Sequence, residues 1–418
     1  MRIAVEGCGH GTLHAIYSSI KKSCQVNGWD GVDLLIIGGD FQAVRNSYDL
    51  NCMSVPQKYR SVGDFHEYYS GKRTAPYLTL FVGGNHEASS HLRELYYGGW
   101  VAPNIYYLGA ANVLRFGDLR IAGLSGIWKG YNYNKPHFER LPYDANDVKS
   151  AYHVREIDVR KLLLLRDQID VGLSHDWPRG VEWKGDHQAL FRKKDLFEAD
   201  AKAGTLGSSA ARHVMDRLRP PHWFAAHLHC KFAAVVNYSH EETNGQSQKG
   251  AGSNGGWDGA NEAPGVDAAT EVIRAAPPAP VKNSDEIDLD LDMDDEADDP
   301  IPAPSANSIA EQTDASPAAN PTKSQASTAP PTDLATQPPH TDPIPHPPTS
   351  SVPDSLRARL PASFTRPASP PPIVPLPHPP TITNTLTNFL ALDKCLPHRN
   401  FLQILDIFPL HPSTPPHP

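Results

Sequence analysis

The sequence predicts an α/β fold for its first 240 residues, and three observations support this. Short apolar runs typical of buried strands alternate with stretches whose apolar residues recur at helical spacing. Several of these runs end in glycine followed by a polar side chain that can bind a metal. Eight of the 41 prolines but six of the seven tryptophans lie within residues 1–240, so we expect the core in this part of the chain.

The first elements are a strand and a helix. We expect the strand at residues 2–6, where it runs into the Gly-rich turn 7–11. A helix over about 12–24 follows, because Leu13 and Ile16 begin an apolar series at helical spacing. This strand end presents Cys8 and His10.

The next two strands end in the same way. The apolar run 33–37 leads into Gly38-Gly39-Asp40, and the run 77–82 leads into Gly83-Gly84-Asn85-His86. Paired glycines let the backbone turn sharply beside the following side chain. Asp40 therefore becomes a hard oxygen ligand at the mouth of a sheet, and we expect metal chemistry to centre on it.

The second half of this region repeats the pattern. We expect a hairpin turn at 116–119, and then further elements at 156–167 (helix), 169–173 (strand), 208–218 (helix) and 231–237 (strand). Two more segments end in histidines, at His175 and at His227-Leu228-His229. If His227 and His229 alternate along a strand, both point to one side of it.

Five strand ends thus carry possible metal ligands although they span more than 200 residues. Parallel sheets gather such ends at one edge, so we expect the side chains to converge. A carboxylate able to bridge, an Asn carbonyl and several imidazoles are typical ligands of a dinuclear transition-metal site. The strand ends offer, in order, Cys8 and His10, Asp40, Asn85 and His86, His175, and His227 and His229.

Segment 125–155 combines aromatic and basic residues in a way that suits stacking on bases and contact with phosphates. Tyr131, Tyr133 and Lys135 are the candidates for substrate binding. The alternative is an ordinary loop that packs its rings on the core.

The composition changes after residue 238. Residues 239–385 are rich in Ser, Gly, Ala and Pro, which predicts a disordered low-complexity insertion. Its block 285–299 has ten acidic residues; without it, 38 basic residues face 37 acidic ones, so the net charge of −9 does not exclude a polyanionic substrate. The block is a solvated linker or, alternatively, a protein-docking tail. Residues 386–408 form an apolar segment expected to dock back on the core, and 409–418 a Pro-rich tail.

The five cysteines are too scattered for a disulfide framework, which favours a reducing compartment. No apolar run reaches the roughly 18 residues of a membrane span. We therefore expect a soluble protein of the nucleus or cytoplasm.

The motif order Gly-Asp, Gly-Asn-His-Glu, His and His-x-His over residues 1–237 resembles the calcineurin-like metallophosphoesterases. Two departures narrow the resemblance. Cys8 stands where that family usually has Asp, and no second Asp occurs within residues 41–46. Together with the motifs Ser174–Pro178 and Phe389–Pro397, these departures resemble the RNA lariat debranching enzymes, which act in the nucleus.

The resemblance implies a four-layer αββα sandwich that hydrolyses the 2′–5′ branch linkage of excised intron lariats. It implies a first metal held by Cys8, His10, Asp40 and His229. It implies a second metal held by Asp40, Asn85, His175 and His227, with Asp40 as the bridge. His86 would then be the general acid, and segment 125–155 a lariat recognition loop.

Several alternatives stay open. Cys8 as a thiolate favours iron and zinc, with manganese able to substitute, but it can also be a core residue beside a vacant first site. His86 can instead make a structural contact to a loop carbonyl. Asp176 is either a substrate contact or, as we favour, the partner that orients His175. The rival functions are a phosphoesterase acting on phosphoproteins or small nucleotides and a non-catalytic binding scaffold.

Overall fold

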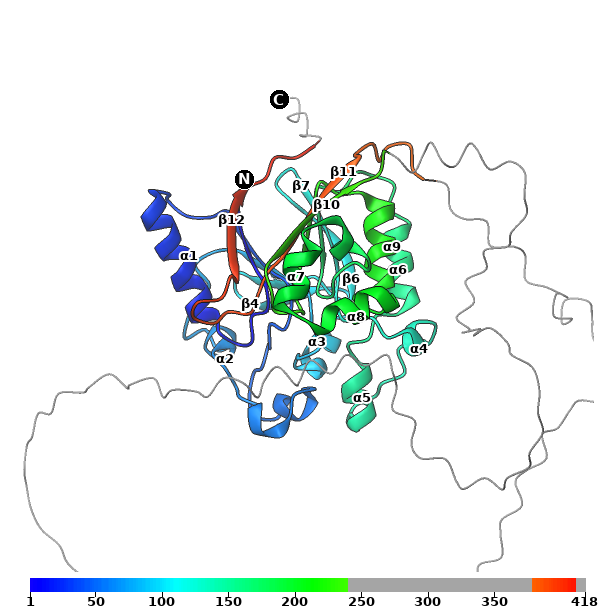
Figure 1. Cartoon of the computed structure of the whole chain (residues 1–418). Coiled ribbons are helices and arrows are strands. Elements are labelled where there is room, and N and C mark those ends of the chain that lie inside the picture. Colours follow the sequence, from blue (N-terminus) through cyan, green and yellow to red (C-terminus); the bar gives the residue numbers. More distant parts are fainter. Residues whose placement is uncertain (240–377, 411–418) are drawn as a thin grey trace, which may run out of the picture. The chain divides into compact units, whose positions relative to one another are not determined.

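Two sheets of six strands each form the centre of the described part of the computed structural model, which covers residues 1–239 and 378–410 (Figure 1). Most of segment 239–385, for which we predict disorder, lies outside these residues. The acidic block 285–299 and most of the Pro-rich tail 409–418 lie outside them as well.

The first sheet has the order β12-β1-β2-β3-β5-β4. Its inner four strands, β1, β2, β3 and β5, are parallel, and an antiparallel strand pairs at each edge. The strands are β1 (Arg2–Glu6), β2 (Leu34–Ile37), β3 (Thr79–Phe81), β4 (Gly99–Ala102), β5 (Ile105–Tyr107) and β12 (Leu402–Asp406).

The second sheet repeats this plan in the order β10-β11-β9-β8-β7-β6. Its four parallel strands are β11, β9, β8 and β7, again with an antiparallel strand at each edge. The strands are β6 (Ala111–Phe116), β7 (Leu119–Leu124), β8 (Val171–Ser174), β9 (His222–Ala225), β10 (Phe232–Asn237) and β11 (Leu386–Ala391).

Helices cover the outer face of each sheet (Figure 1). Helix α1 lies on the first sheet, and α6, α7, α8 and α9 lie on the side of the second. Their bounds are α1 (Leu13–Asn27), α6 (Glu156–Leu163), α7 (His187–Lys193), α8 (Leu196–Ala203) and α9 (Ser209–Leu218). Shorter helices occupy the loops: α2 (Phe65–Tyr69), α3 (Ser89–Glu94), α4 (Gly130–Tyr133), α5 (Ala145–Ser150) and 3-10 turns at Asp49–Cys52, Gln57–Tyr59 and Val181–Lys184.

Alternating side chains build the layers. In β1, Ile3 and Val5 point into a central cluster that also contains Ile121 and Leu173 of the second sheet. Ala4, between them in the sequence, points the other way, into a cluster formed with α1. A third cluster packs α6 and α9 against the second sheet. The expected α/β sandwich of two mixed sheets with helices is confirmed, and both sheets have apolar side chains on both faces.

The C-terminal segment contributes one strand to each sheet. Strand β12 pairs with β1, and β11 lies between β9 and β10. Leu386 at the start of β11 lies opposite Asn237 at the end of β10. The expected docking of this segment on the core is therefore confirmed.

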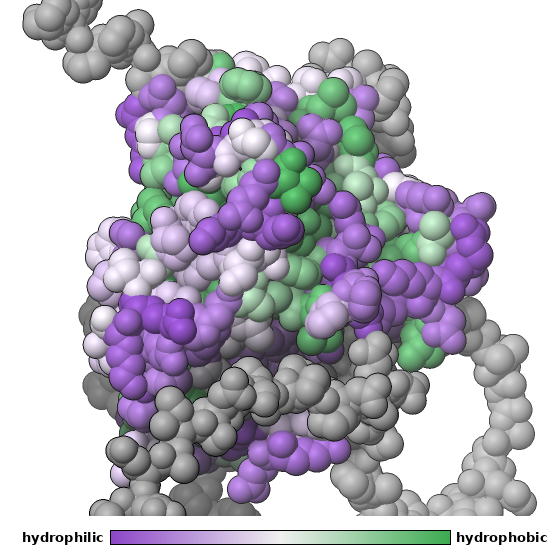
Figure 2. Space-filling model, turned by 90° about the vertical axis from the view of Figure 1, so that its left-hand side faces the viewer, coloured by the Kyte–Doolittle hydropathy of each residue, from purple (hydrophilic) through white to green (hydrophobic). Residues whose placement is uncertain are grey.

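Within the described residues, no helix combines the length and the apolar composition needed to cross a bilayer. Figure 2 shows the face of the molecule at the left of Figure 1, where hydrophilic side chains are interspersed with smaller apolar patches.

Candidate metal centre

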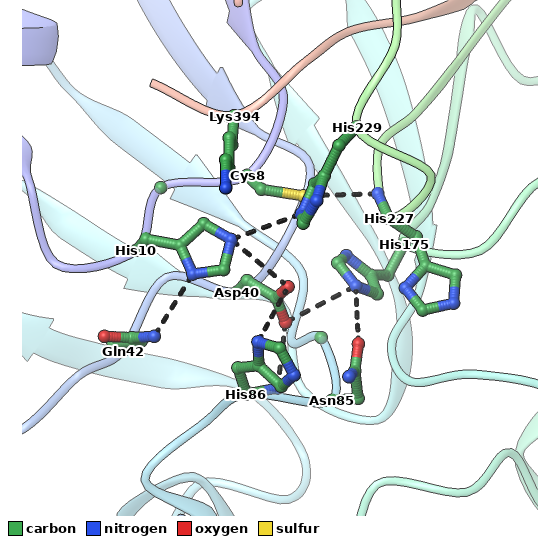
Figure 3. Close-up of polar contacts among 12 residues, drawn as sticks. Cys8, His10, Asp40, Gln42, Asn85, His86, His175, His227, His229 and Lys394 are labelled. Carbon is green, nitrogen blue, oxygen red and sulfur yellow. Dashed lines mark hydrogen bonds and ion pairs between the residues drawn. The ribbon is translucent and has the colours of Figure 1, made fainter. Parts of the chain in front are cut away.

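The predicted ligands follow the carboxyl ends of parallel strands in both sheets. Cys8 and His10 follow β1, and Asp40 follows β2. Asn85 follows β3, His175 follows β8, and the pair His227 and His229 follows β9. Figure 3 shows their side chains around one centre, with Asp40 in the middle.

Four of these side chains form one tight group. The donor atoms of Cys8, His10, Asp40 and His229 all lie within 4.8 Å of one another. Nε2 of His10 lies 3.4 Å from Nε2 of His229 and 3.7 Å from a carboxylate oxygen of Asp40. Sulfur, imidazole and carboxylate donors at this spacing suit a transition-metal ion.

The protonation states fit a metal ion as well. Burial lowers the pKa of His10 to about 4, although Asp40 opposes the shift. Burial also lowers the pKa of His229 well below its ordinary value. Both imidazoles are therefore neutral near pH 7, and their lone pairs can bind a cation. Burial and the carboxylates of Asp40 and Glu6 raise the pKa of the Cys8 thiol, so a bound cation is what would stabilise the thiolate.

The remaining predicted ligands lie on the other side of Asp40. Nε2 of His175 is 3.2 Å from Oδ1 of Asn85 and 3.4 Å from Oδ1 of Asp40. The rings of His175 and His227 have centroids 5.0 Å apart. Burial alone raises the pKa of Asp40, but the surrounding imidazoles outweigh it and hold the pKa well below its ordinary value. Asp40 is thus an anion that faces both groups.

His86 lies beside both groups. Its backbone N–H donates to Oδ1 of Asp40 at 2.9 Å, and its Nδ1 lies 3.8 Å from Oδ2 of the same carboxylate. Its side chain is 13% exposed, so solvent or a substrate can reach it.

Two glycines are required for this approach. A Cβ on Gly39 would lie 2.2 Å from Nδ1 of His175, and one on Gly84 would lie 2.1 Å from Oδ1 of Asp40. Gly39 also has φ +122, which L side chains rarely adopt. The glycines at the strand ends therefore make room for the metal-binding side chains.

Glu87 is a site residue that the sequence reasoning missed. Its buried carboxylate accepts backbone N–H bonds from Phe41 (2.8 Å), Gln42 (2.8 Å) and Gly84 (2.9 Å). It therefore clamps the loop of Asp40 to the loop of Asn85. Its place directly after Asn85-His86 was the available signal.

Glu6 was missed as well. It is fully buried, and neither carboxyl oxygen has a hydrogen-bond partner among the described residues. Burial and the nearby charge of Asp40 raise the pKa of Glu6 well above the ordinary value.

The hypothesis that Asp176 orients His175 is wrong. Nδ1 of His175 instead contacts the carbonyl oxygen of Gly38 at 2.9 Å. The buried Asp176 carboxylate accepts the backbone N–H of Trp128 at 3.1 Å. Burial raises its pKa to about 6. Asp176 thus ties the start of segment 125–155 to the residue after His175, and its predicted contact with substrate stays a prediction.

The positions of His227 and His229 also differ from the expectation. Strand β9 ends at Ala225, so both residues lie in the following loop and not on a strand. Both have left-handed backbone, with φ 63 and 47. This turn, and not the alternation of side chains along a strand, directs both imidazoles toward the centre. The predicted strand position of the two residues is therefore wrong.

The three candidates of segment 125–155 differ in exposure. Tyr131 is 50% exposed, and Nζ of Lys135 lies 5.7 Å from its ring centroid. Tyr133 packs on Trp128 with ring centroids 4.9 Å apart, and it lies against the core. A ligand can therefore reach Tyr131 and Lys135, whereas Tyr133 packs between the segment and the core.

A buried polar network holds segment 125–155 on the core. Arg155, which is fully buried, donates to Glu139 at 2.5 Å, and His137 contacts Asp158 at 2.8 Å. The hydroxyl of Ser150 also donates to Glu139, at 2.6 Å. A cavity of about 60 Å³ lies between this network and the strand end at Gly83-Gly84. The segment is thus fixed beside the metal centre.

Comparison with known proteins agrees with this geometry. A sequence model of the calcineurin-like phosphoesterases matches residues 1–231, which is more than half of the chain. The chain belongs to the calcineurin-like phosphoesterase family. A second model, of the C-terminal domain of lariat debranching enzymes, matches residues 384–417.

Several lariat debranching enzymes are similar to this phosphoesterase. The human enzyme is 52% identical over 238 residues, which are 57% of this chain and 44% of that protein. The enzyme of Arabidopsis thaliana is 50% identical over 241 residues (58% and 57%), and that of Schizosaccharomyces pombe 50% over 246 residues (59% and 52%). The aligned region spans about half the length of these curated relatives.

Proposed function

We propose that this chain is a metal-dependent phosphodiesterase that hydrolyses the 2′–5′ branch linkage of excised intron lariat RNA. The observation that carries the proposal is the meeting of Cys8 with the C-terminal segment. Lys394 forms an isolated parallel bridge with Cys8, and that segment matches the C-terminal domain of lariat debranching enzymes. The general phosphoesterase match ends at residue 231, so the segment is what favours branched RNA over other phosphoesters.

Two sites would share Asp40. Cys8, His10, Asp40 and His229 would hold one metal, and Asp40, Asn85, His175 and His227 the other. A pair of divalent ions supplies activation of water and neutralises charge on phosphate oxygens. The soft sulfur of Cys8 favours iron or zinc, with manganese able to substitute in the test tube.

The side chains around the centre have separate tasks. His86, next to Asp40 and partly exposed, would protonate the leaving 2′ oxygen. Tyr131 and Lys135 would hold a base and a phosphate of the RNA at the surface of the lariat recognition loop. Glu87 would keep the loops of Asp40 and Asn85 in register during the reaction.

The test compares two substrates on the full chain. Purified protein of known metal content is given a branched RNA oligonucleotide and, separately, p-nitrophenyl phosphate. We expect cleavage at the 2′–5′ bond and little monoester turnover. Brisk monoester turnover without branch cleavage would favour a phosphoprotein or small-nucleotide phosphatase. Protein that retains no transition metal after anaerobic purification would point to a binding scaffold. Work on introns implies a nuclear location, which imaging of the tagged full chain would check.

A further inference from the structure

The C-terminal segment adds another strand end to the edge where the metal centre lies. Strand β11 runs parallel to β9, so its carboxyl end reaches the same edge as the end that carries His227 and His229. Lys394 follows β11 by three residues.

Backbone contacts fix Lys394 beside Cys8. The N–H of Cys8 donates to the carbonyl of Asp393 at 3.3 Å, and the N–H of Cys395 donates to the carbonyl of Cys8 at 3.2 Å. These bonds flank the parallel bridge between Cys8 and Lys394. Neighbouring residues in register share one side of the pleat, so both side chains project the same way.

Figure 3 shows the result, with the Lys394 side chain next to Cys8 and its ammonium group on the side of His10. The positive charge of Lys394 also helps burial to lower the pKa of His10 and of His229. Lys394 therefore lies at the rim of the Cys8–His10–His229 group and away from Asn85 and His175.

Among the described residues, no carboxylate lies within ion-pairing distance of the Lys394 ammonium group, and the neighbouring Asp393 faces Arg399 instead. Lys394 is partly exposed, so a ligand can reach it. Metal ions bound by the Cys8–His10–His229 group would repel the ammonium group of Lys394, and a bound anion would offset this repulsion. The anion that the proposed reaction brings is a phosphate.

We infer that Lys394 binds a backbone phosphate of the branched RNA on the Cys8–His10–His229 side of the centre. This inference rests on the proposed function. It makes the C-terminal segment part of the substrate site and not only of the fold. A lysine serves here as a compact point charge on a flexible stem, which suits a phosphate oxygen that it can approach from several directions.

The experiment uses Lys394→Met, which keeps an apolar stem but removes the charge, and Lys394→Arg, which restores the charge. For each variant, kcat/KM for branched RNA is measured over a series of monovalent salt concentrations. For Lys394→Met we expect a loss of about tenfold at low salt. We also expect the slope of log kcat/KM against log salt to become shallower by about 0.7, because one phosphate contact is lost. Lys394→Arg should keep the wild-type slope.

Controls separate this effect from damage to the fold. Lys202→Ala removes an equal charge from α8, where Lys202 pairs with Glu198, and should leave the slope unchanged. Metal content and the thermal midpoint are measured for each variant. An unchanged slope in Lys394→Met overturns the inference, whether or not kcat/KM falls, because a merely structural loss does not alter the salt dependence.

Equilibrium binding of a labelled branched RNA to the full chain is measured over the same salt series. If the wild-type protein binds this RNA but does not cleave it, the proposed function fails while the binding slope still tests Lys394. If the wild type cleaves it and Lys394→Met keeps both slopes, the proposed function stands and the inference fails. Absence of any binding or cleavage overturns both.

Discussion

Four residues of the candidate metal centre, His10, Asp40, His227 and His229, have left-handed backbone, and so has Gln42, whose side chain lies 3.3 Å from Nδ1 of His10. Each such conformation costs a non-glycine residue about 1–3 kcal/mol, and it persists only where its surroundings fix it. Here the fixing contacts are visible: the N–H of His10 donates to the carbonyl of Asp40 at 2.6 Å, and the N–H of His227 donates to Sγ of Cys8 at 3.2 Å. The donor atoms are thus positioned by the fold itself.

Removing the imidazole of His86 tests its role as general acid. We expect His86→Ala to keep the wild-type metal content, since neither proposed ligand group includes this side chain. Turnover of branched RNA should fall by about 10²–10⁴-fold, the usual contribution of a positioned acid. Metal content is measured by mass spectrometry and turnover by single-turnover kinetics. His66→Ala, at a half-buried histidine of helix α2 outside both proposed ligand groups, is the matched control and should change neither quantity. Loss of metal from His86→Ala would contradict the assignment.

Replacing the sulfur of Cys8 tests its role as a ligand. Cys8→Asp puts a hard oxygen where the soft thiolate was, so we expect the preference to move from zinc or iron toward manganese. The ratio of activity with manganese to activity with zinc should rise about tenfold. Cys52→Ser, at a half-buried cysteine in the 3-10 turn Asp49–Cys52, should keep the wild-type ratio. A wild-type metal profile in Cys8→Asp would show that the sulfur binds no metal.

Much of this centre could be predicted from the sequence, because each ligand type follows a recognisable strand end. Asp40 and Asn85 needed only the local signal of paired glycines after an apolar run. Lys394 could not be found in this way, since its position depends on pairing between residues 8 and 394. Glu6 was equally hidden, because nothing in its local sequence marks a buried carboxyl group that has no hydrogen-bond partner among the described residues.

At the scale of elements, segment 125–155 depends on the network around Arg155 and Glu139. Burial raises the pKa of Glu139, but the ion-pair contact with His137, the hydrogen bond from Ser150 and the charge of Arg155 outweigh it and lower the pKa to about 2. A carboxylate whose pKa is lower in the folded state stabilises the fold above its unfolded pKa. The contribution of Glu139 is therefore complete above its ordinary value of 4.5 and is lost as the pH falls toward 2.

Glu139→Gln should therefore reduce the free energy of unfolding by about 3 kcal/mol at pH 7, because Arg155 is left buried without its anion. The difference from the wild type should shrink as the pH falls from about 4.5 toward 2. Urea unfolding at several pH values measures this difference in the free energy of unfolding. The other carboxylates titrate in both proteins, so their contributions cancel in the difference. Glu156→Gln removes the half-buried partner of the exposed Arg160 and should cost less than about 1 kcal/mol. A pH-independent difference would show that Glu139 is not ionised in the network.

The strands could be predicted more fully than the helices of the second half. Strands β1, β2, β3, β8 and β10, the hairpin of β6 and β7 and the helices α1 and α9 lie where the sequence pattern placed them. The edge strand β4 was missed because its four residues include glycine and an exposed tryptophan, Trp100. Helices α7 and α8 were missed because each buries only one or two side chains, too few to give a helical period.

At the scale of the whole molecule, residues 386–406 complete both sheets, because they supply β11 to the second sheet and β12 to the first. Strand β11 lies between β9 and β10, so it is an inner strand of the second sheet and not an addition at its edge. Deleting residues 378–418 should therefore prevent folding, because β10 would lose its only strand partner in the described sheet. The N-terminal strand β1 would lose β12 as well.

The span 240–377, by contrast, should be replaceable. The described residues on either side of it pair before β11 begins, since the N–H of Tyr238 donates to the carbonyl of Thr385 at 2.9 Å. Closing a loop between two segments that already pair depends only weakly on loop length. A chain with about 15 residues of Gly and Ser in place of 240–377 should keep its thermal midpoint within a few degrees and its turnover of branched RNA within about twofold. The chain deleted after residue 239 serves as the matched control and should be unfolded by circular dichroism. A shortened chain that folds and binds metal but fails to cleave branched RNA would show that the span itself takes part in the reaction.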